Sequence, residues 1–127
     1  MNIINIEHIA KVYQVGSEEV FALRDVSLRI DKNEYVAIMG PSGSGKSTLA
    51  KTIVNLMPFR LGKVLFEGID ITSLKTIQCI NAGIGYFVQG GRVFPHLSLQ
   101  ENLRCAVHDL NDREFAFRLS FLKEYFT

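Results

Sequence analysis

The chain has 127 residues, of which 47% are hydrophobic and 21% charged, with a formal net charge of +1. This length and composition predict one small globular domain, and the balanced charge gives no reason to expect a nucleic-acid partner. No apolar run approaches the roughly 18 residues of a membrane span, and the N-terminus lacks signal-peptide features. Cys79 and Cys105 stand in no metal-binding pattern, so a reduced cytoplasmic protein is expected.

The beginning of the chain predicts antiparallel strands. Residues 2–9 alternate in polarity, which places Ile6 and His8 on one face, and residues 21–30 alternate in the same way. A turn is predicted between these two segments, at residues 15–19. A short apolar run at residues 34–39 then predicts a buried central strand.

The middle of the chain predicts a β-hairpin, a helix and another strand. Residues 63–71 are interrupted by Gly68 and are typical of a short hairpin. Thr72 is a candidate cap for a helix reaching about Ile80. Residues 84–88 predict a second buried strand, ending at Gln89.

The end of the chain predicts two capped helices. Ser98 and Glu101 form a capping box, and either Asn111 or Asp112 caps a last helix with Phe115 on its apolar face. Antiparallel strands followed by strand–helix units indicate a mixed α/β domain.

Residues 40–47 read G-P-S-G-S-G-K-S, a complete P-loop pattern. The apolar run before it and the predicted helix after it, residues 48–56, are the context that this motif requires. Backbone N–H groups at a helix N-terminus attract anions, and glycines let the backbone approach phosphates closely. The alternative is a glycine-rich turn without a ligand. Chance would produce the pattern on the order of a few times per thousand such chains, which favours the phosphate site.

The loop assigns a role to each of its polar side chains. Lys46 can bridge the β- and γ-phosphates of a nucleotide, and the Ser47 hydroxyl can bind magnesium. The predicted nucleotide-binding residues of the loop are Gly40, Pro41, Ser42, Gly43, Ser44, Gly45, Lys46, Ser47 and Thr48.

Ordered segments along the whole chain resemble the nucleotide-binding domains of ATP-binding cassette (ABC) proteins. The resemblance implies an α/β P-loop NTPase core of ABC type with an N-terminal antiparallel β subdomain. It also implies ATP and Mg²⁺ as cofactors. Three of these segments correspond to named motifs of the family: residues 10–13 resemble the A-loop, residues 34–49 the Walker A region and residues 84–89 the strand that leads to the Q-loop. The other matching segments are residues 22–28, 62–71 and 94–103.

The resemblance gives roles to two residues outside the P-loop. Tyr13 would stack on adenine, although a tyrosine packed at a strand end is the alternative. Gln89 would touch magnesium and sense the γ-phosphate, which makes it a catalytic residue together with Lys46. The alternative for Gln89 is a polar cap on a strand. Val88 stands where the family often has proline.

The resemblance also implies partners. The apolar loop Phe94-Pro95-His96 corresponds to the region that docks a membrane permease, while a hydrophobic staple explains the adjacent Leu97 equally well. A second nucleotide-binding domain would complete the ATP site, and the protein would lie at the inner face of the membrane. The loop after Gln89 resembles branched-chain amino acid importers, whereas the N-terminal third resembles lipoprotein-release and macrolide-export ATPases. The cargo is therefore open.

Four hydrolytic elements of the family have no counterpart in the sequence: the L-S-G-G-Q signature, the Walker B aspartate, the catalytic glutamate and the switch histidine. The expectation is a domain truncated before the signature, spanning residues 1–127, that binds ATP without turning it over alone. A dedicated nucleotide-binding module and a soluble, non-transport ABC ATPase are alternatives. A P-loop kinase or GTPase is the most distant one.

Overall fold

The computed structural model describes residues 2–59, 61–107 and 109–126. The chain divides into an N-terminal unit, Met1–Tyr86, and a C-terminal unit, Phe87–Thr127. Each unit is described by itself. Within the described residues, no helix is both long and apolar enough to cross a membrane.

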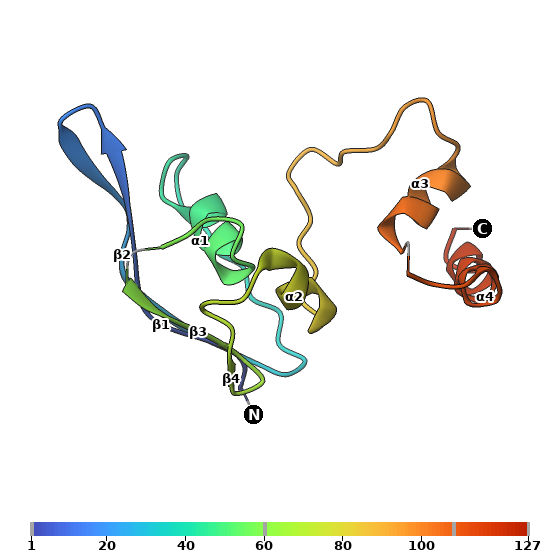
Figure 1. Cartoon of the computed structure of the whole chain (residues 1–127), viewed down its shortest axis with the longest axis horizontal. Coiled ribbons are helices and arrows are strands. Elements are labelled where there is room, and N and C mark those ends of the chain that lie inside the picture. The colour runs from blue at the N-terminus through green and yellow to red at the C-terminus, as the bar shows by residue number, and fades with distance from the viewer. Residues whose placement is uncertain (1, 60, 108, 127) are drawn as a thin grey trace. The chain divides into compact units, whose positions relative to one another are not determined.

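The N-terminal unit contains a four-stranded antiparallel sheet (Figure 1). Two long strands, β1 (Asn2–Val15) and β2 (Glu18–Asp31), form a hairpin around the predicted turn. The strands β3 (Leu61–Phe66) and β4 (Ile69–Asp70) form a second hairpin, as the sequence predicted. The strand order is β2-β1-β3-β4, so β1 lies between β2 and β3.

A pair of irregularities changes the buried face of β1. His8 and Asp25 both have positive φ, 52° and 51°, and the register of β1 with β2 shifts between Ile6 and Ile9. Ile6 and Ile9 are therefore the buried residues, and the predicted pairing of Ile6 with His8 on one face is wrong. The exposed His8 ring instead contacts Asp25, with 2.6 Å between Nδ1 and Oδ1.

Two helices, α1 (Lys46–Ile53) and α2 (Thr76–Asn81), belong to the same unit. Figure 1 shows both on the same side of the sheet. Apolar residues of the two helices and the sheet form one hydrophobic core. Its buried members are Ile6, Ile9, Leu23, Leu49, Val54, Val64, Ile71, Cys79 and Ile84.

The boundaries of both helices differ from the prediction. The helix α1 begins at Lys46 and ends at Ile53, so the predicted apolar position Leu56 lies beyond it and is exposed. The helix α2 begins only at Thr76, because Thr72 is engaged in the β3–β4 hairpin. Its hydroxyl accepts a hydrogen bond from the Val64 N–H at 3.0 Å.

The two predicted central strands are absent from the described structure. Residues 34–39 pair with no strand in the described ranges, and Tyr35 and Met39 are 103% and 89% exposed. Residues 84–88 are likewise unpaired; among them Ile84 is buried in the core and the half-buried Tyr86 packs against it. A continuous apolar strand is typical of a parallel sheet covered on both faces, and its pairing depends on distant segments. The described residues supply no such neighbour.

The C-terminal unit contains α3 (Leu99–Ala106) and α4 (Asp112–Lys123), both capped as predicted. Ser98 N–H donates to Glu101 Oε2 at 2.7 Å, and Glu101 N–H donates back to Ser98 Oγ at 3.3 Å. The Ser98 hydroxyl and N–H hold the pKa of the Glu101 carboxyl below its ordinary value. Of the two candidate caps for the last helix, the structure selects Asn111, which accepts from Glu114 N–H.

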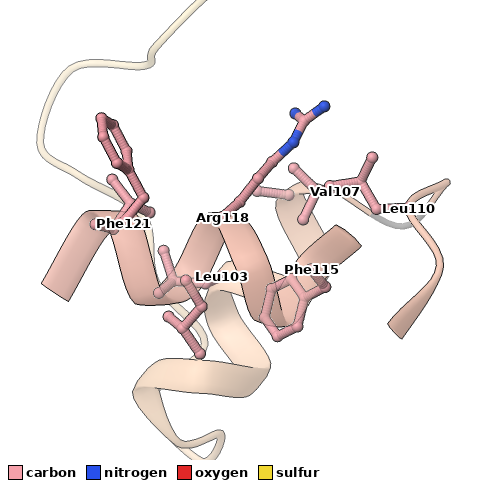
Figure 2. A pocket seen from close by; sticks show the side chains of 9 residues that line it. Leu103, Val107, Leu110, Phe115, Arg118 and Phe121 are labelled. Atoms are coloured by element: carbon pink, nitrogen blue, oxygen red, sulfur yellow. The ribbon is translucent and has the colours of Figure 1, made fainter. Parts of the chain in front are cut away.

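Apolar residues of these two helices line a pocket of about 340 Å³ (Figure 2), among them Phe115 of the predicted apolar face. Figure 2 shows the Arg118 guanidinium pointing away from Leu103 and Phe115. Apart from Arg118, the lining side chains carry no polar group, so this pocket offers hydrophobic packing and no catalytic chemistry. The candidate site lies elsewhere.

Candidate phosphate-binding site

The P-loop forms an exposed turn that leads directly into α1. Two of its glycines adopt left-handed conformations, with φ of 83° at Gly43 and 90° at Gly45. Residues with a Cβ rarely adopt these angles. The loop closes through a hydrogen bond from Ser44 N–H to the Pro41 carbonyl at 3.2 Å. Its residues lie at the surface of the unit, so an anion from solvent can reach them.

The Lys46 ammonium is folded back over the loop. It donates to the carbonyl oxygens of Gly40 and Pro41, both at 2.7 Å, and to Ser44 Oγ at 3.2 Å. An ammonium group has three donors, and these three contacts use all of them. The positive charge is therefore placed by the loop's own backbone beside the N-terminus of α1.

The N-terminus of α1 lacks the capping that the other long helices have. Gly45 is its N-cap residue, its first turn contains no acidic side chain, and no described side chain caps it. In contrast, α3 and α4 are capped by Ser98 and Asn111 and carry acidic residues in their first turns. Uncapped N–H groups and the helix dipole both favour an anion at this position.

Packing against the sheet fixes where this helix end lies. Ala22 is the extra residue of a β-bulge, since Lys11 pairs with Leu23 and Val12 pairs with Phe21. An added Cβ at Gly45 would lie 2.5 Å from the Ala22 carbonyl oxygen. Glycine is therefore required at position 45 by close backbone approach as well as by its φ. The start of α1 is held directly on β2.

Two residues with hydroxyl groups, Ser47 and Thr48, follow Lys46 in the first turn of α1. The side chain of Ser47 is exposed and Thr48 is half-buried. The part of the chain that the structure describes contains no cluster of three or more His, Cys, Asp or Glu residues that could hold a metal ion. An ion that keeps several waters and takes oxygen from phosphate, as Mg²⁺ does, fits a single hydroxyl such as that of Ser47.

Tyr13 lies near the end of β1, where it pairs with Val20. Its ring is half-buried, and its hydroxyl contacts Met57 Sδ at 3.0 Å. Lys11 Nζ lies 5.0 Å from the ring centroid. Tyr13 and the P-loop therefore belong to the same unit. Lys11, two residues before Tyr13, pairs with Leu23, and Leu23 follows the bulge residue Ala22.

Gln89 does not lie at the end of a strand, because residues 84–88 form none in the described structure. It is exposed, lies in a turn with Gly90 and belongs to the C-terminal unit. Its predicted contact with a magnesium ion at Ser47 therefore stays a prediction.

The apolar loop at Phe94 is exposed and is fixed by Asn102. Phe94 is 60% exposed. The Asn102 side chain accepts from Phe94 N–H at 2.7 Å and donates to the carbonyl oxygens of Phe94, Leu97 and Ser98. One amide thus ties the loop to the first turn of α3 and presents Phe94 in a defined conformation.

Sequence reasoning missed three residues that organise these regions: Asn55, Lys11 and Asn102. Asn55 has a φ of 54°, and its amide donates to the carbonyl oxygens of Ile71 and Leu74 at 2.6 and 3.0 Å. An asparagine just beyond a helix is a known signal for the left-handed conformation. The two-residue spacing of Lys11 and Tyr13 places both on one strand face, a signal that was also available. The multiple contacts of Asn102 had no local signal beyond the adjacent capping box.

The profile of the ABC transporter family matches residues 23–125. The chain belongs to this family. It is 39% identical over 104 residues to a probable branched-chain amino acid transport ATP-binding protein, LivF, of Archaeoglobus fulgidus. It is 36% identical over 112 residues to the lipopolysaccharide export system ATP-binding protein LptB of Haemophilus influenzae. These matches cover 82% and 88% of this chain, but only 44% and 45% of the relatives.

Solved ABC structures share the fold. One is a dimeric ATP-binding cassette in a post-hydrolysis state, bound to ADP and phosphate, with a TM-score of 0.81 and 31% identity. Another is a nucleotide-free cassette from an ABC transporter, with a TM-score of 0.74 and 30% identity. The matches cover 94% and 93% of this chain and 56% and 46% of those chains. The chain therefore spans about half the length of the ABC proteins it matches.

Proposed function

We propose that residues 1–127 form the N-terminal part of the ATPase subunit of an ABC transporter and that residues 40–48 bind the phosphates of Mg-ATP. The observation that carries this proposal is the uncapped N-terminus of α1, with the Lys46 ammonium folded over the same loop. Positive partial charges and one full charge converge there without an acidic partner in the first turn.

Binding exchanges internal contacts for contacts with the nucleotide. The Lys46 ammonium leaves the carbonyl oxygens of Gly40 and Pro41 and bridges the β- and γ-phosphates, while the first N–H groups of α1 donate to phosphate oxygens. The Ser47 hydroxyl and the Gln89 amide are the proposed Mg²⁺ ligands. The magnesium ion supplies charge neutralisation on the phosphates. Tyr13 is the proposed adenine platform.

The proposed partners are a transmembrane permease and a second nucleotide-binding domain, at the cytoplasmic face of a membrane. The names of the relatives support a transporter, since they are transport and export ATP-binding proteins, and one neighbouring cassette structure is dimeric. The exposed Phe94 loop is the proposed permease contact. The relatives act on different cargoes, so the cargo is not proposed.

A second candidate function is nucleotide binding without turnover. It applies to residues 1–127 taken alone, which contain no L-S-G-G-Q signature and no recognisable Walker B aspartate or catalytic glutamate. Without a positioned general base, a rate contribution on the order of 10²–10⁴-fold is lost. Phosphate release from Mg-ATP by the purified chain separates the two functions. A rate at the buffer background supports the binding module, whereas turnover that Lys46→Ala abolishes supports an autonomous ATPase.

Titration calorimetry with Mg-ATP tests the site itself. Lys46→Ala removes a charge-assisted contact to phosphate, and we expect at least about tenfold weaker binding. Lys51→Ala is the matched control, because Lys51 lies in the last turn of the same helix. We expect its affinity to stay within about threefold of wild type. Equal affinities of the Lys46 variant and wild type contradict the proposal.

A further inference from the structure

Tyr13 forms a small cluster with Lys11, Met57 and Pro58 that the P-loop does not explain. Lys11 Nζ lies 5.0 Å from the ring centroid and donates to the Pro58 carbonyl oxygen at 2.5 Å. The Tyr13 hydroxyl donates to Met57 Sδ at 3.0 Å. The ring is thus restrained at its hydroxyl by Met57 and on one face by an ammonium group.

The chain brings these residues together from two elements that are far apart in sequence. Lys11 and Tyr13 lie two positions apart on β1, so their side chains share a face of the strand. Met57 and Pro58 follow the end of α1 and precede β3. The contact therefore connects the strand that carries the aromatic ring to the segment between α1 and β3.

We propose that Lys11 is a positioning residue for the nucleobase: it holds the Tyr13 ring and occupies one of its faces, so that adenine stacks on the opposite face. This inference rests on the proposed ATP binding. A cation attracted to an aromatic face is held by the ring quadrupole, and the hydrogen bond to Pro58 keeps the ammonium in place. A ring whose orientation is already restrained loses less freedom when a base stacks on it.

Two other roles of Lys11 give different results. If the lysine competes with adenine for the same face of the ring, removing its charge strengthens ATP binding. If Lys11 only stabilises the contact between β1 and residues 57–58, its loss weakens the binding of every ligand of this unit, with or without a base, to the same extent. The proposed role alone predicts a loss confined to ligands that contain a base.

The experiment measures the affinities of the full chain for Mg-ATP and for Mg-tripolyphosphate, which has the phosphates but no base. We expect Lys11→Met to weaken ATP binding about two- to fivefold and to leave tripolyphosphate binding unchanged. Lys11→Arg keeps a cation that can lie over the ring, so we expect it to retain the wild-type ATP affinity. Lys32→Met is the matched control, because it removes the same charge at an exposed turn away from the cluster.

The outcomes separate this inference from the function it rests on. Unchanged or stronger ATP binding in Lys11→Met overturns the positioning role, and so does an equal loss for both ligands. A failure of Lys11→Arg to retain affinity, with normal folding, also overturns it. If the wild-type chain binds neither ATP nor tripolyphosphate, the proposed phosphate site itself is wrong.

Discussion

Gly45 is the position where the P-loop, the helix α1 and the sheet constrain one another most tightly. Substitution by alanine introduces two separate penalties. The residue has a φ of 90°, which disfavours any side chain, and the new Cβ would lie 2.5 Å from the Ala22 carbonyl oxygen and 3.2 Å from Leu23 Cδ2. The first neighbour is backbone in a strand, so it cannot rotate away. Either β2 or the start of α1 must move.

The two penalties can be estimated separately. A left-handed conformation costs a residue with a Cβ about 1–2 kcal/mol. Forcing atoms into a well-packed contact costs typically about 1–3 kcal/mol more. We therefore expect Gly45→Ala to lower the free energy of unfolding by about 2–5 kcal/mol, a large part of the roughly 5–15 kcal/mol of an ordinary domain.

Gly43→Ala is the matched control in the same loop. Its φ is 83°, but an added Cβ would have no neighbour within 4 Å. Only the conformational penalty applies, so we expect a loss of about 1–2 kcal/mol. Urea unfolding followed by far-UV circular dichroism gives both values. If the two variants are equally stable, the contact between Gly45 and Ala22 does not hold α1 on the sheet, and our account of how the P-loop is placed is refuted.

Two further predictions concern the caps and the end of α1. The pKa of the Glu101 carboxyl is lowered by the Ser98 hydroxyl and N–H, so its stabilisation of α3 is present above the ordinary carboxyl pKa and is lost as the pH falls through the lower folded value. Amide chemical shifts of α3 measured between about pH 3 and 6 will show this loss, and Glu101→Gln will remove their pH dependence. If the shifts of the Glu101→Gln variant follow the wild-type pH profile, the assignment to Glu101 is contradicted. Asn55→Ala removes two hydrogen bonds to backbone carbonyls and places alanine at a φ of 54°. We expect Asn55→Ala to lower the free energy of unfolding, measured in urea, by about 2–4 kcal/mol. Asn55→Gly should recover only the part of this loss that comes from the backbone conformation. Recovery of the full wild-type stability by glycine would show that the hydrogen bonds contribute nothing.

Signals read from neighbouring residues predicted the structure well. The β1–β2 and β3–β4 hairpins and the caps at Ser98 and Asn111 were all predicted, and each depends on contacts within a few residues or across one turn. Thr72 was the exception among the proposed caps. A threonine before an apolar run is a valid cap signal, but here its hydroxyl binds the N–H of Val64 on β3, which lies eight positions earlier.

Signals that depend on distant partners predicted the structure poorly. The apolar runs at 34–39 and 84–88 have strand composition, yet composition does not specify which strand will pair with them. The predicted buried face of β1 was also wrong beyond Ile6. Alternation assumes a regular strand, and the irregularity at His8 shifts which residues point into the core. Positive φ is uncommon for residues other than glycine, and although histidine and aspartate adopt it more often than most, no pattern in the sequence marks these two positions.

The candidate site shows the same division. The turn of the P-loop and the helix after it were predicted because the backbone conformation follows from the loop's own glycines, of which Gly43 and Gly45 are left-handed. The binding roles of the loop's residues stay predictions. The contacts that place it were not predicted, since Ala22 and Gly45 are 23 positions apart in the sequence and meet only through a bulge. The surroundings of Tyr13 likewise come from Met57 and Pro58, which no spacing rule connects to β1.

These contacts hold the two sides of the P-loop differently. From Gly45 onward the backbone is fixed by β2 and by the hydrogen bonds of α1, beginning with Leu49 N–H to the Gly45 carbonyl at 2.8 Å. Before Gly40 the chain is exposed, and no described strand pairs with it. Lys46 connects the two sides, since its ammonium, on the first residue of α1, donates to the Gly40 and Pro41 carbonyl oxygens at the start of the loop. A phosphate that attracts Lys46 must therefore compete with the contacts that close the loop. Phosphate affinity in this chain consequently depends on the strength of the hydrogen bonds from Lys46 to the carbonyl oxygens of residues 40 and 41, as well as on the N–H donors of α1.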